Sequence, residues 1–377
     1  MLGRLMFLLA FLGAVLTFHP ALGDTPGRWS AEQANAWAKR QGWLLGCNFL
    51  PSTAVNSLEM FQADSFDAKT IDRELGWAES LGYNSVRIFL NSLLWQQNGK
   101  GFLERLDRFL AIADKHHIGA AFVLFDSCWD PNPTLGKQPD PIPRVHNSRW
   151  IQSPGSWTLK DAAKREALKH YVHGVVGHFR NDRRVQWWDI WNEPEQDDSG
   201  PACTHPMNKE EKRRLVTMTL EKAFAWAREA KPSQPLTSGL LGGPWNEPEK
   251  LAPLQRLQWQ NSDVLSFHCY EPLSAVKVRV ESLRPLGRPI LCTEFMARTC
   301  GSTFDPILGY FHDQGVAAYS AALVEGKIQT KFPWDSLNGR KYDAEPSPWF
   351  HDVFHNDGRP YDQREVEYIR RIAGVKR

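Results

Sequence analysis

Segments that read as strands alternate with segments that read as helices along almost all of this 377-residue chain, and no other feature constrains its fold as much. Each apolar, β-branched or aromatic run is followed by a stretch whose apolar residues recur every three or four positions. Such alternation predicts parallel strands joined by right-handed crossovers. The predicted strands are 43–49, 84–90, 119–125, 185–191, 235–240, 263–269, 289–293 and 316–323.

Eight such strands, followed by helices, predict a closed barrel rather than an open sheet. The main predicted helices are 30–40, 67–81, 102–117, 159–180, 209–230, 251–259, 274–283, 305–314 and 363–373. The competing architecture, an open doubly wound sheet, calls for a glycine-rich phosphate turn after its first strand. Here Gly46-Cys47-Asn48-Phe49 is followed by Leu50-Pro51 instead. We therefore expect a single α/β domain over residues 24–377, a (β/α)8 TIM barrel.

Two predicted strands end in a glutamate. The run 185–191 leads into Asn192-Glu193-Pro194, and Pro194 ends the strand because it cannot donate to a sheet ladder. The run 289–293 leads into Glu294 in the same way. The carboxyl ends of barrel strands carry the chemistry of such folds. We therefore expect Glu193 and Glu294 to meet across one pocket.

A pair of carboxylates can perform both halves of glycoside hydrolysis. One holds a proton for the leaving oxygen, and the other stays charged and attacks the anomeric carbon. Glu193 follows three tryptophans and is expected to be desolvated, which raises a carboxyl pKa. Taken alone, either glutamate could instead form a surface ion pair. A second Asn-Glu-Pro, at 246–248, follows a turn rather than an apolar run, and we interpret it as loop surface.

These motifs resemble those of a known group of enzymes. Trp191-Asn192-Glu193-Pro194 resembles the fourth-strand Asn-Glu-Pro motif of clan A glycoside hydrolases, and Thr293-Glu294-Phe295 resembles their seventh-strand nucleophile motif. The chain is most similar to glycoside hydrolase family 5, which holds cellulases and mannanases and relatives described as xylanases. The resemblance runs from about Trp43 to the C-terminus.

The resemblance implies a retaining mechanism, with Glu193 as general acid/base and Glu294 as nucleophile. Retaining enzymes hold the two carboxyl groups about 5–5.5 Å apart. By the same resemblance, Asn192 would bind the sugar 2-hydroxyl, and Arg87 would orient Glu294 and keep it ionised.

The sixth predicted strand ends in His268-Cys269-Tyr270, which resembles the clan's His-x-Tyr. Tyr270 would then donate a hydrogen bond to Glu294, and His268 would help to shape the sugar subsite. The alternative for His268 is a histidine of the core with its hydrogen bonds satisfied.

Further candidates lie in the loops. Asn56 and Glu59 belong to the first long loop, where they either face the pocket or cap a helix and meet solvent. Asp126 ends the third strand and could bind a sugar hydroxyl. Aromatic rings that stack on sugars, or simply pack their loops, are Trp129, Trp150, Trp245 and Trp334.

One position departs from the family pattern. Clan members carry a tryptophan on the eighth strand, as the floor under the reacting sugar, and Ala321 stands at that position here. A stacking surface worth about 1 kcal/mol is then missing. Either another tryptophan such as Trp334 fills the space, or activity is weak.

The first 23 residues predict a signal peptide. Arg4 supplies the positive charge, residues 5–18 are apolar, and Gly23 is a small residue at the cleavage point. The alternative is a membrane anchor, but the apolar run is short for a span. We expect a secreted or periplasmic protein with no membrane contact after cleavage.

Composition excludes some partners. The 45 basic and 43 acidic residues give a net charge of +2, so no basic surplus indicates nucleic acid. The 16 tryptophans suit a carbohydrate substrate, whose rings stack on flat apolar faces. Nothing in the sequence indicates the oligomeric state.

The sequence holds six cysteines, which an exported protein could oxidise. Six allow 15 pairings, and the sequence does not choose among them. Cys47, Cys269 and Cys292 lie in predicted strands and are expected to be free thiols. The better disulfide candidates lie in or near loops: Cys128, Cys203 and Cys300.

Metal binding is not expected, and neither is a cofactor. The chain has no CxxC pair, and His170/His173 and His351/His355 do not enclose the glutamate of an HExxH site.

Two alternatives to a retaining β-glycosidase stay open. A carbohydrate-binding protein without activity could use the same scaffold, as Ala321 suggests. A transglycosylase could use the same covalent intermediate with a sugar acceptor.

Overall fold

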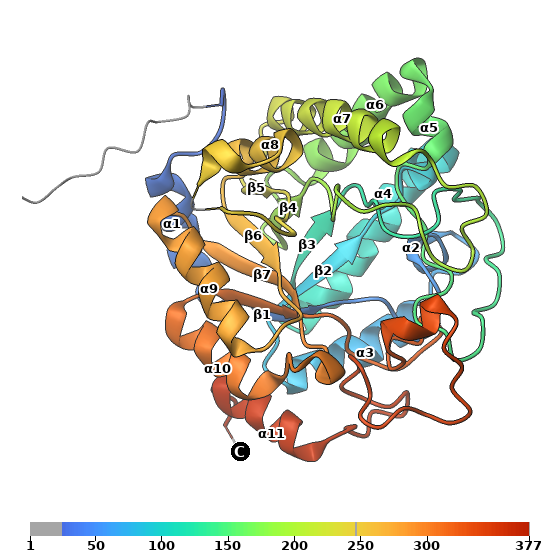
Figure 1. Ribbon diagram of the computed structural model, residues 1–377, viewed down its shortest axis with the longest axis vertical. Helices are drawn as coiled ribbons and strands as arrows, with labels where there is room; N and C mark the ends of the chain where they lie inside the picture. Colours follow the sequence, from blue (N-terminus) through green and yellow to red (C-terminus); the bar gives the residue numbers. More distant parts are fainter. Residues whose placement is uncertain (1–24, 246, 377) are drawn as a thin grey trace, which may run out of the picture.

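The computed structural model describes residues 25–245 and 247–376, and the predicted signal peptide lies outside them. Eight parallel strands form one sheet in the order β5-β4-β3-β2-β1-β8-β7-β6, which confirms the predicted TIM barrel (Figure 1). The strands are β1 (Leu45–Asn48), β2 (Ser85–Phe89), β3 (Gly119–Val123), β4 (Val185–Asp189), β5 (Leu236–Thr237), β6 (Leu265–His268), β7 (Ile290–Phe295) and β8 (Ala317–Ser320).

The barrel closes between β5 and β6 through backbone hydrogen bonds beside the short strand β5. Asp263 N donates to Leu236 O at 2.7 Å, and Leu240 N donates to Ser266 O at 2.8 Å. Between β1 and β2 the backbones lie so close that a Cβ on Gly46 would meet Ser85 O at 1.9 Å. Only glycine fits at that position.

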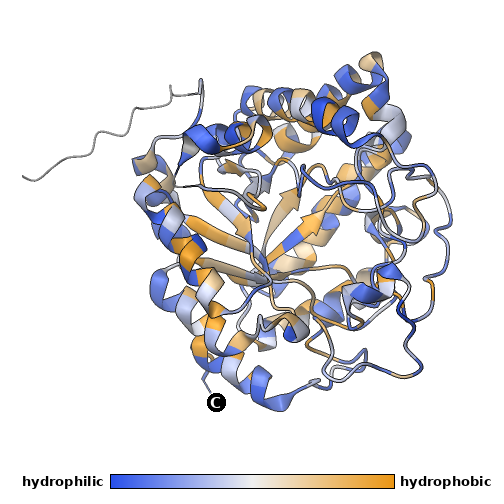
Figure 2. Cartoon of the chain, viewed as in Figure 1, coloured by the Kyte–Doolittle hydropathy of each residue, from blue (hydrophilic) through white to orange (hydrophobic). Residues whose placement is uncertain are grey.

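Helices surround the strands and turn their apolar sides inward (Figures 1 and 2). They are α1 (Ala31–Gln41), α2 (Ser57–Phe61), α3 (Ala68–Ser80), α4 (Ser92–Lys115), α5 (Ser156–Lys160), α6 (Ala162–Phe179), α7 (Lys209–Glu229), α8 (Pro253–Asn261), α9 (Leu273–Leu283), α10 (Phe304–Gln314) and α11 (Gln363–Ile372). No helix in the described ranges is both long and apolar enough to span a bilayer.

Local capping explains where the helices differ from the prediction. The predicted helix 159–180 is two helices, because Asp161 is extended and its side chain accepts hydrogen bonds from Ala163 N and Lys164 N at the start of α6. Helix α4 begins ten residues before the predicted 102, with Asn91 as its cap and a kink at Asn98. Helix α2 was not predicted.

Buried side chains fill the barrel toward the amino ends of its strands. A cavity in the barrel interior can therefore form only at the carboxyl ends. Trp187 of β4 packs edge-on against Tyr319 of β8, with ring centroids 5.6 Å apart, and its indole donates to the Tyr319 hydroxyl at 2.9 Å. Ala34 and Trp37 of α1 belong to the same buried cluster.

Candidate active site

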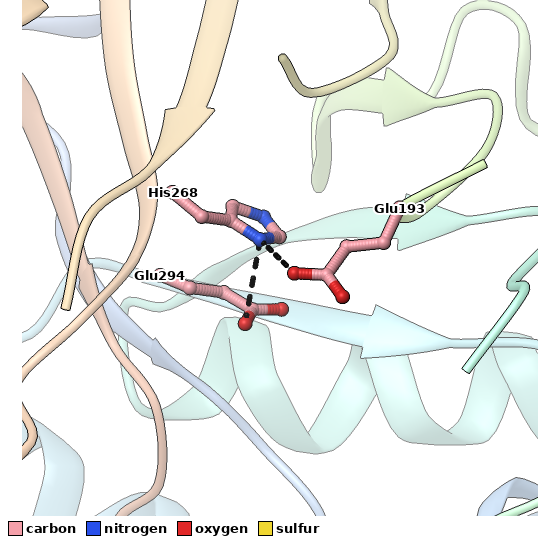
Figure 3. Close-up of side chains that lie close together, drawn as sticks. All are labelled: Glu193, His268 and Glu294. Atoms are coloured by element: carbon pink, nitrogen blue, oxygen red, sulfur yellow. Dashed lines mark hydrogen bonds and ion pairs between the residues drawn. The ribbon is translucent and has the colours of Figure 1, made fainter. Parts of the chain in front are cut away.

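The two glutamates lie together at the carboxyl ends of β4 and β7. Glu193 is buried and has a left-handed backbone, with φ of 43°. Figure 3 shows the carboxylates of Glu193 and Glu294 beside the imidazole of His268; one polar atom of each of the three side chains lies within 4.8 Å of the others. A single atom of a ligand could therefore contact both carboxylates.

Glu294 is held by a permanent cation and a phenol. Arg87 Nη1 donates to Glu294 Oε1 at 3.0 Å, and the Tyr270 hydroxyl donates to Oε2 at 2.6 Å. Arg87 is fully buried in β2, and its other nitrogens reach Asp189 Oδ2 at 2.8 Å and 3.1 Å. Burial lowers the pKa of Arg87, but the carboxylates of Asp189 and Glu294 outweigh it and raise that pKa. Glu294 therefore faces a charge that does not titrate.

Glu193 is held by three donors that carry no permanent charge. His268 Nδ1 lies 2.7 Å from Glu193 Oε1, while the Cys128 thiol and Gln196 Nε2 lie 3.1 Å and 2.9 Å from Oε2. Burial raises the pKa of Glu193, as the sequence suggests, but the hydrogen bond and charge of His268 together with the hydrogen bonds of Cys128 and Gln196 outweigh it. The pKa of Glu193 is therefore lowered.

His268 stands between the two carboxylates, with Nδ1 also 3.5 Å from Glu294 Oε2. Burial lowers the pKa of His268, but both carboxylates raise it and prevail. Its Nε2 is buried with no hydrogen-bond partner among the described residues. The imidazole thus shares its Nδ1 proton with Glu193 and links the two acids.

Asn192 and Asp126 form a buried frame next to Glu193. Arg87 Nη2 donates to Asn192 Oδ1 at 2.6 Å, and Asn192 Nδ2 donates to Asp126 Oδ1 at 2.9 Å. Trp150 Nε1 donates to Asp126 Oδ2 at 2.6 Å. Burial raises the pKa of Asp126 to about 6, against the donors that lower it. Asp126 does not line the cavity; it contacts residues that do.

A cavity of about 490 Å³ opens above the two glutamates, within the range of small-molecule sites. Trp129, Trp150 and Trp334 line it, together with Asn192 and Tyr270. Trp245, by contrast, is buried against Phe267, with ring centroids 6.0 Å apart. Three of the four loop tryptophans therefore face the cavity.

Ala321 also lines the cavity, so the space that a larger side chain would occupy is open there. Trp334 lies on the side of Glu294, since its ring meets Tyr270 edge to face with centroids 4.9 Å apart. It also contacts Phe350, at 4.8 Å. Trp334 thus supplies an aromatic side to the cavity near Tyr270.

The structure places Asn56 and Glu59 away from the cavity lining. Asn56 Oδ1 caps α2 by accepting from Leu58 N and Glu59 N, both at 3.0 Å. Its Nδ2 donates to Gln138 Oε1 and Arg149 O. Glu59 pairs with Lys327 Nζ at 2.6 Å. Both residues tie loops together.

Several residues of the site carried no signal in the sequence. Gln196 and Cys128 reach Glu193 from two loops, and His146 and His351 line the cavity. The prediction that Cys128, Cys203 and Cys300 are disulfide candidates is wrong, since all six cysteines are free. Cys128 contacts Glu193 instead. Asp189 could have been found, as a charged residue inside an apolar strand.

Within the described part of the chain, Glu193, His268 and Glu294 form the group that could hold a metal ion. Arg87, 3.0 Å from Glu294, would repel a cation at that position. The atoms also have protein partners already. The arrangement suits an organic substrate better than a metal.

Residues 136–238, which include the β4 motif, match the model of glycosyl hydrolase family 10. Endo-1,4-beta-xylanase A of Thermotoga maritima is 34% identical over an alignment of 104 residues, which covers 25% of this chain and 9% of that protein. The match thus spans about a tenth of the length of that relative.

Solved structures share the fold over most of the chain. Exo-beta-1,4-mannosidase Op5Man5 of an Opitutaceae bacterium superposes with a TM-score of 0.58 at 18% identity, over 89% of this chain and 59% of that one. A family 5, subfamily 18 protein of Bifidobacterium longum, solved with Manβ1-4GlcNAc, gives 0.57 at 14% identity, over 88% and 78%. By its fold and its central motif, this chain resembles the clan A glycoside hydrolases, in particular those of family 5.

Proposed function

We propose that the protein is a retaining β-glycosidase that cleaves β-linked oligosaccharides or polysaccharides. The observation that carries the proposal is the approach of the Glu193 and Glu294 carboxylates to within 4.8 Å. Retaining enzymes hold their carboxyl groups about 5–5.5 Å apart, whereas inverting enzymes need about 6.5–9.5 Å to fit a water molecule. The spacing supports double displacement.

In the first step, Glu294 attacks the anomeric carbon while Glu193 gives a proton to the departing oxygen. A glycosyl ester on Glu294 forms. In the second step, Glu193 takes a proton from water, and the resulting hydroxide breaks the ester from the other face. Two inversions restore the original β configuration.

Arg87 and Tyr270 prepare Glu294 for attack. Arg87 donates to Glu294 from a position that Asp189 fixes. Tyr270 holds Oε2 through one hydrogen bond, which leaves the carboxylate's direction fixed before substrate arrives. Such prior orientation reduces the reorganisation needed at the transition state.

The proton for the first step belongs to the Glu193–His268 pair. Because His268 lowers the pKa of Glu193, the resting proton lies nearer Nδ1. We propose that this proton crosses to Glu193 Oε1 as the leaving oxygen binds beside that same atom, so that His268 becomes neutral and Glu193 acts as the acid. The neutral imidazole then accepts the proton that Glu193 takes from water in the second step.

The test is hydrolysis of 4-nitrophenyl β-mannoside, β-glucoside and β-xyloside and of the matching β-1,4-linked oligosaccharides. The relatives named above make mannose and xylose the first choices. Glu294→Ala and Glu294→Gln serve as controls. We expect turnover by the native protein and a β product as the first anomer in proton NMR. No turnover of any substrate, or equal activity in the variants, would overturn the proposal.

Ala321 favours a second candidate, a sugar-binding protein without activity, because the expected stacking floor is absent. Calorimetry would then show sugar binding by the native protein while the same sugars stay intact. Transfer of the sugar to a second sugar, seen as longer products by mass spectrometry, would instead indicate a transglycosylase. An exported location remains a prediction from residues 1–23.

A further inference from the structure

Three segments meet over one half of the cavity: residues 49–56 after β1, residues 138–155 in the second part of the loop after β3, and residues 321–362 after β8. We call them together the loop wall. The loops after β3 and β8 lie side by side on the right of the view in Figure 1. The loops after β6 and β7, residues 269–272 and 296–303, are short by comparison.

Hydrogen bonds join the β3 and β8 loops along their length. Asn147 N donates to Ile328 O at 2.8 Å, and His146 Nδ1 donates to Phe332 O at 2.7 Å. Gln329 bonds in both directions: its Nε2 donates to Ile142 O, and its Oε1 accepts from Arg144 N, each at 2.7 Å. The join therefore uses backbone groups, the buried side chain of His146 and the half-buried side chain of Gln329.

The β1 loop is tied to both of the others. Lys327 N donates to Ser52 O at 3.0 Å, and Lys327 Nζ pairs with Glu59 of α2, the helix that directly follows this loop. The backbones are so close here that a Cβ on Gly326 would lie 2.4 Å from Ser52 Cα. Asn56 Nδ2 completes the set with its bonds to the β3 loop, at 2.9 Å and 3.0 Å. The loop wall is a continuous, mutually bonded structure.

Glu193 acts on the leaving oxygen and Glu294 on the anomeric carbon, so the leaving chain and the attacked sugar occupy different halves of the cavity. The leaving oxygen must lie beside Glu193, and the cavity near that residue is lined by Gln196, Ser199, Gly200 and Leu241. The sugar under attack lies over Glu294, in the half lined by Ala321, Leu323, Ile328, Trp334 and His146. That second half is the one the loop wall bounds.

From this placement we infer that the enzyme attacks its substrate from the non-reducing end and removes a short unit of constant length. A chain that continued beyond the reacting sugar would run into the loop wall, whereas the leaving chain extends from Glu193 over the loops after β4 and β5, which supply Gln196, Ser199, Gly200 and Leu241 to the cavity lining. Alanine at position 321 leaves room for the terminal sugar itself without opening the wall. The inference rests on the proposed function and adds its direction of attack.

The experiment uses the native protein and β-1,4-linked tetra-, penta- and hexasaccharides of mannose, glucose and xylose, each labelled at the reducing end. Early in the reaction, we expect each labelled chain to shorten by the same unit, whatever its length. A bulky acetal on the terminal 4- and 6-hydroxyls of the mannose and glucose chains should slow cleavage roughly 100-fold or more. The uncapped chain of equal length is the matched control.

The outcomes separate the inference from the proposed function. Labelled fragments from internal cuts, a rapid fall in the viscosity of a β-1,4-linked polymer, or equal cleavage of capped and uncapped chains would overturn the inference and leave the glycosidase intact. If the aryl glycosides and all oligosaccharides stay uncleaved, the proposed function fails, and the inference fails with it.

Discussion

The carboxylates of Glu193 and Glu294 lie within 4.8 Å of each other, yet their surroundings differ in kind. Glu294 contacts Arg87, whose charge is permanent, and the hydroxyl of Tyr270. Glu193 contacts His268, Cys128 and Gln196, and the first of these can gain or lose a proton. A fixed cation suits a group that must stay charged, and a titrating partner suits one that must exchange a proton.

The difference shows that burial alone does not decide which acid holds the proton. Three tryptophans precede Glu193 in sequence, and the residue is buried as expected, yet its pKa is lowered rather than raised. Burial is the largest single contribution, but His268, Cys128 and Gln196 together outweigh it. The identity of the neighbouring donor therefore distinguishes the two roles.

The largest effect is expected from removing the nucleophile. Glu294→Ala should reduce kcat by roughly 10⁴-fold or more, because no covalent intermediate can form. Added azide should then attack the anomeric carbon directly and give an α-glycosyl azide. Steady-state kinetics and NMR of the product measure both. A β-glycosyl azide from this variant would mean that the two roles are reversed.

A smaller and more selective loss is expected at the other acid. Glu193→Ala should lower the rate about 10²–10⁴-fold for an oligosaccharide, whose leaving oxygen needs a proton. A dinitrophenyl glycoside, whose leaving group needs none, should still form the glycosyl ester quickly, and azide should give the β-glycosyl azide. Equal losses for both substrates in burst-phase kinetics would contradict the assignment.

The free energy of unfolding should depend on pH through His146, which lines the aromatic side of the cavity near Trp334. Burial lowers the pKa of His146 to about 4, against the Phe332 carbonyl that raises it. Between pH 6.5 and 4, His146 is protonated in the unfolded chain but neutral in the folded chain. The free energy of unfolding is therefore unaffected by His146 above about pH 6.5 and falls as the pH drops toward 4. The loss attributable to His146 is at most about 3 kcal/mol.

Denaturant unfolding at a series of pH values would measure this loss. His146→Gln should flatten part of the slope between pH 6.5 and 4; part should remain, because His351 is buried alongside with its pKa lowered too. An unchanged slope in the variant would show that His146 does not contribute.

The smallest effect is expected at Cys128. Removal of its thiol, which donates to Glu193 Oε2 at 3.1 Å, takes away one donor that lowers the pKa of Glu193. In Cys128→Ala, the limb of the pH–rate profile that reports Glu193 should therefore shift to higher pH, by less than about one pH unit. Cys128→Ser keeps a donor and should restore the native profile. A shift that is the same in both variants would point to a change in packing instead.

The fold and the family resemblance could be predicted because they depend on patterns within the sequence. Alternating strands and helices give the barrel, and Glu193 and Glu294 follow apolar strands whose ends must meet. The break at Asp161 was missed because a capping aspartate interrupts a continuous apolar pattern. Capping is local, and an aspartate three residues after Thr158 could have indicated it.

Other features depend on contacts between distant loops, which no local pattern reveals. Cys128 and Gln196 reach Glu193 from different loops, and the loop wall joins three segments far apart in the sequence. Asn56 stood in the right loop, but only the structure shows that its side chain caps α2 and binds the β3 loop. Such loops determine the shape of the cavity more than the barrel does.

Trapping the covalent intermediate tests the central claim most directly. A 2-deoxy-2-fluoro glycosyl fluoride of the sugar found by the hydrolysis assay should inactivate the enzyme and add one glycosyl mass. The 2-fluorine slows both steps, whereas the good fluoride leaving group keeps the first step fast enough for the glycosyl ester to accumulate. Digestion and mass spectrometry should place the added mass on Glu294. Label on Glu193 or another residue, or an α product with no label at all, would contradict the account.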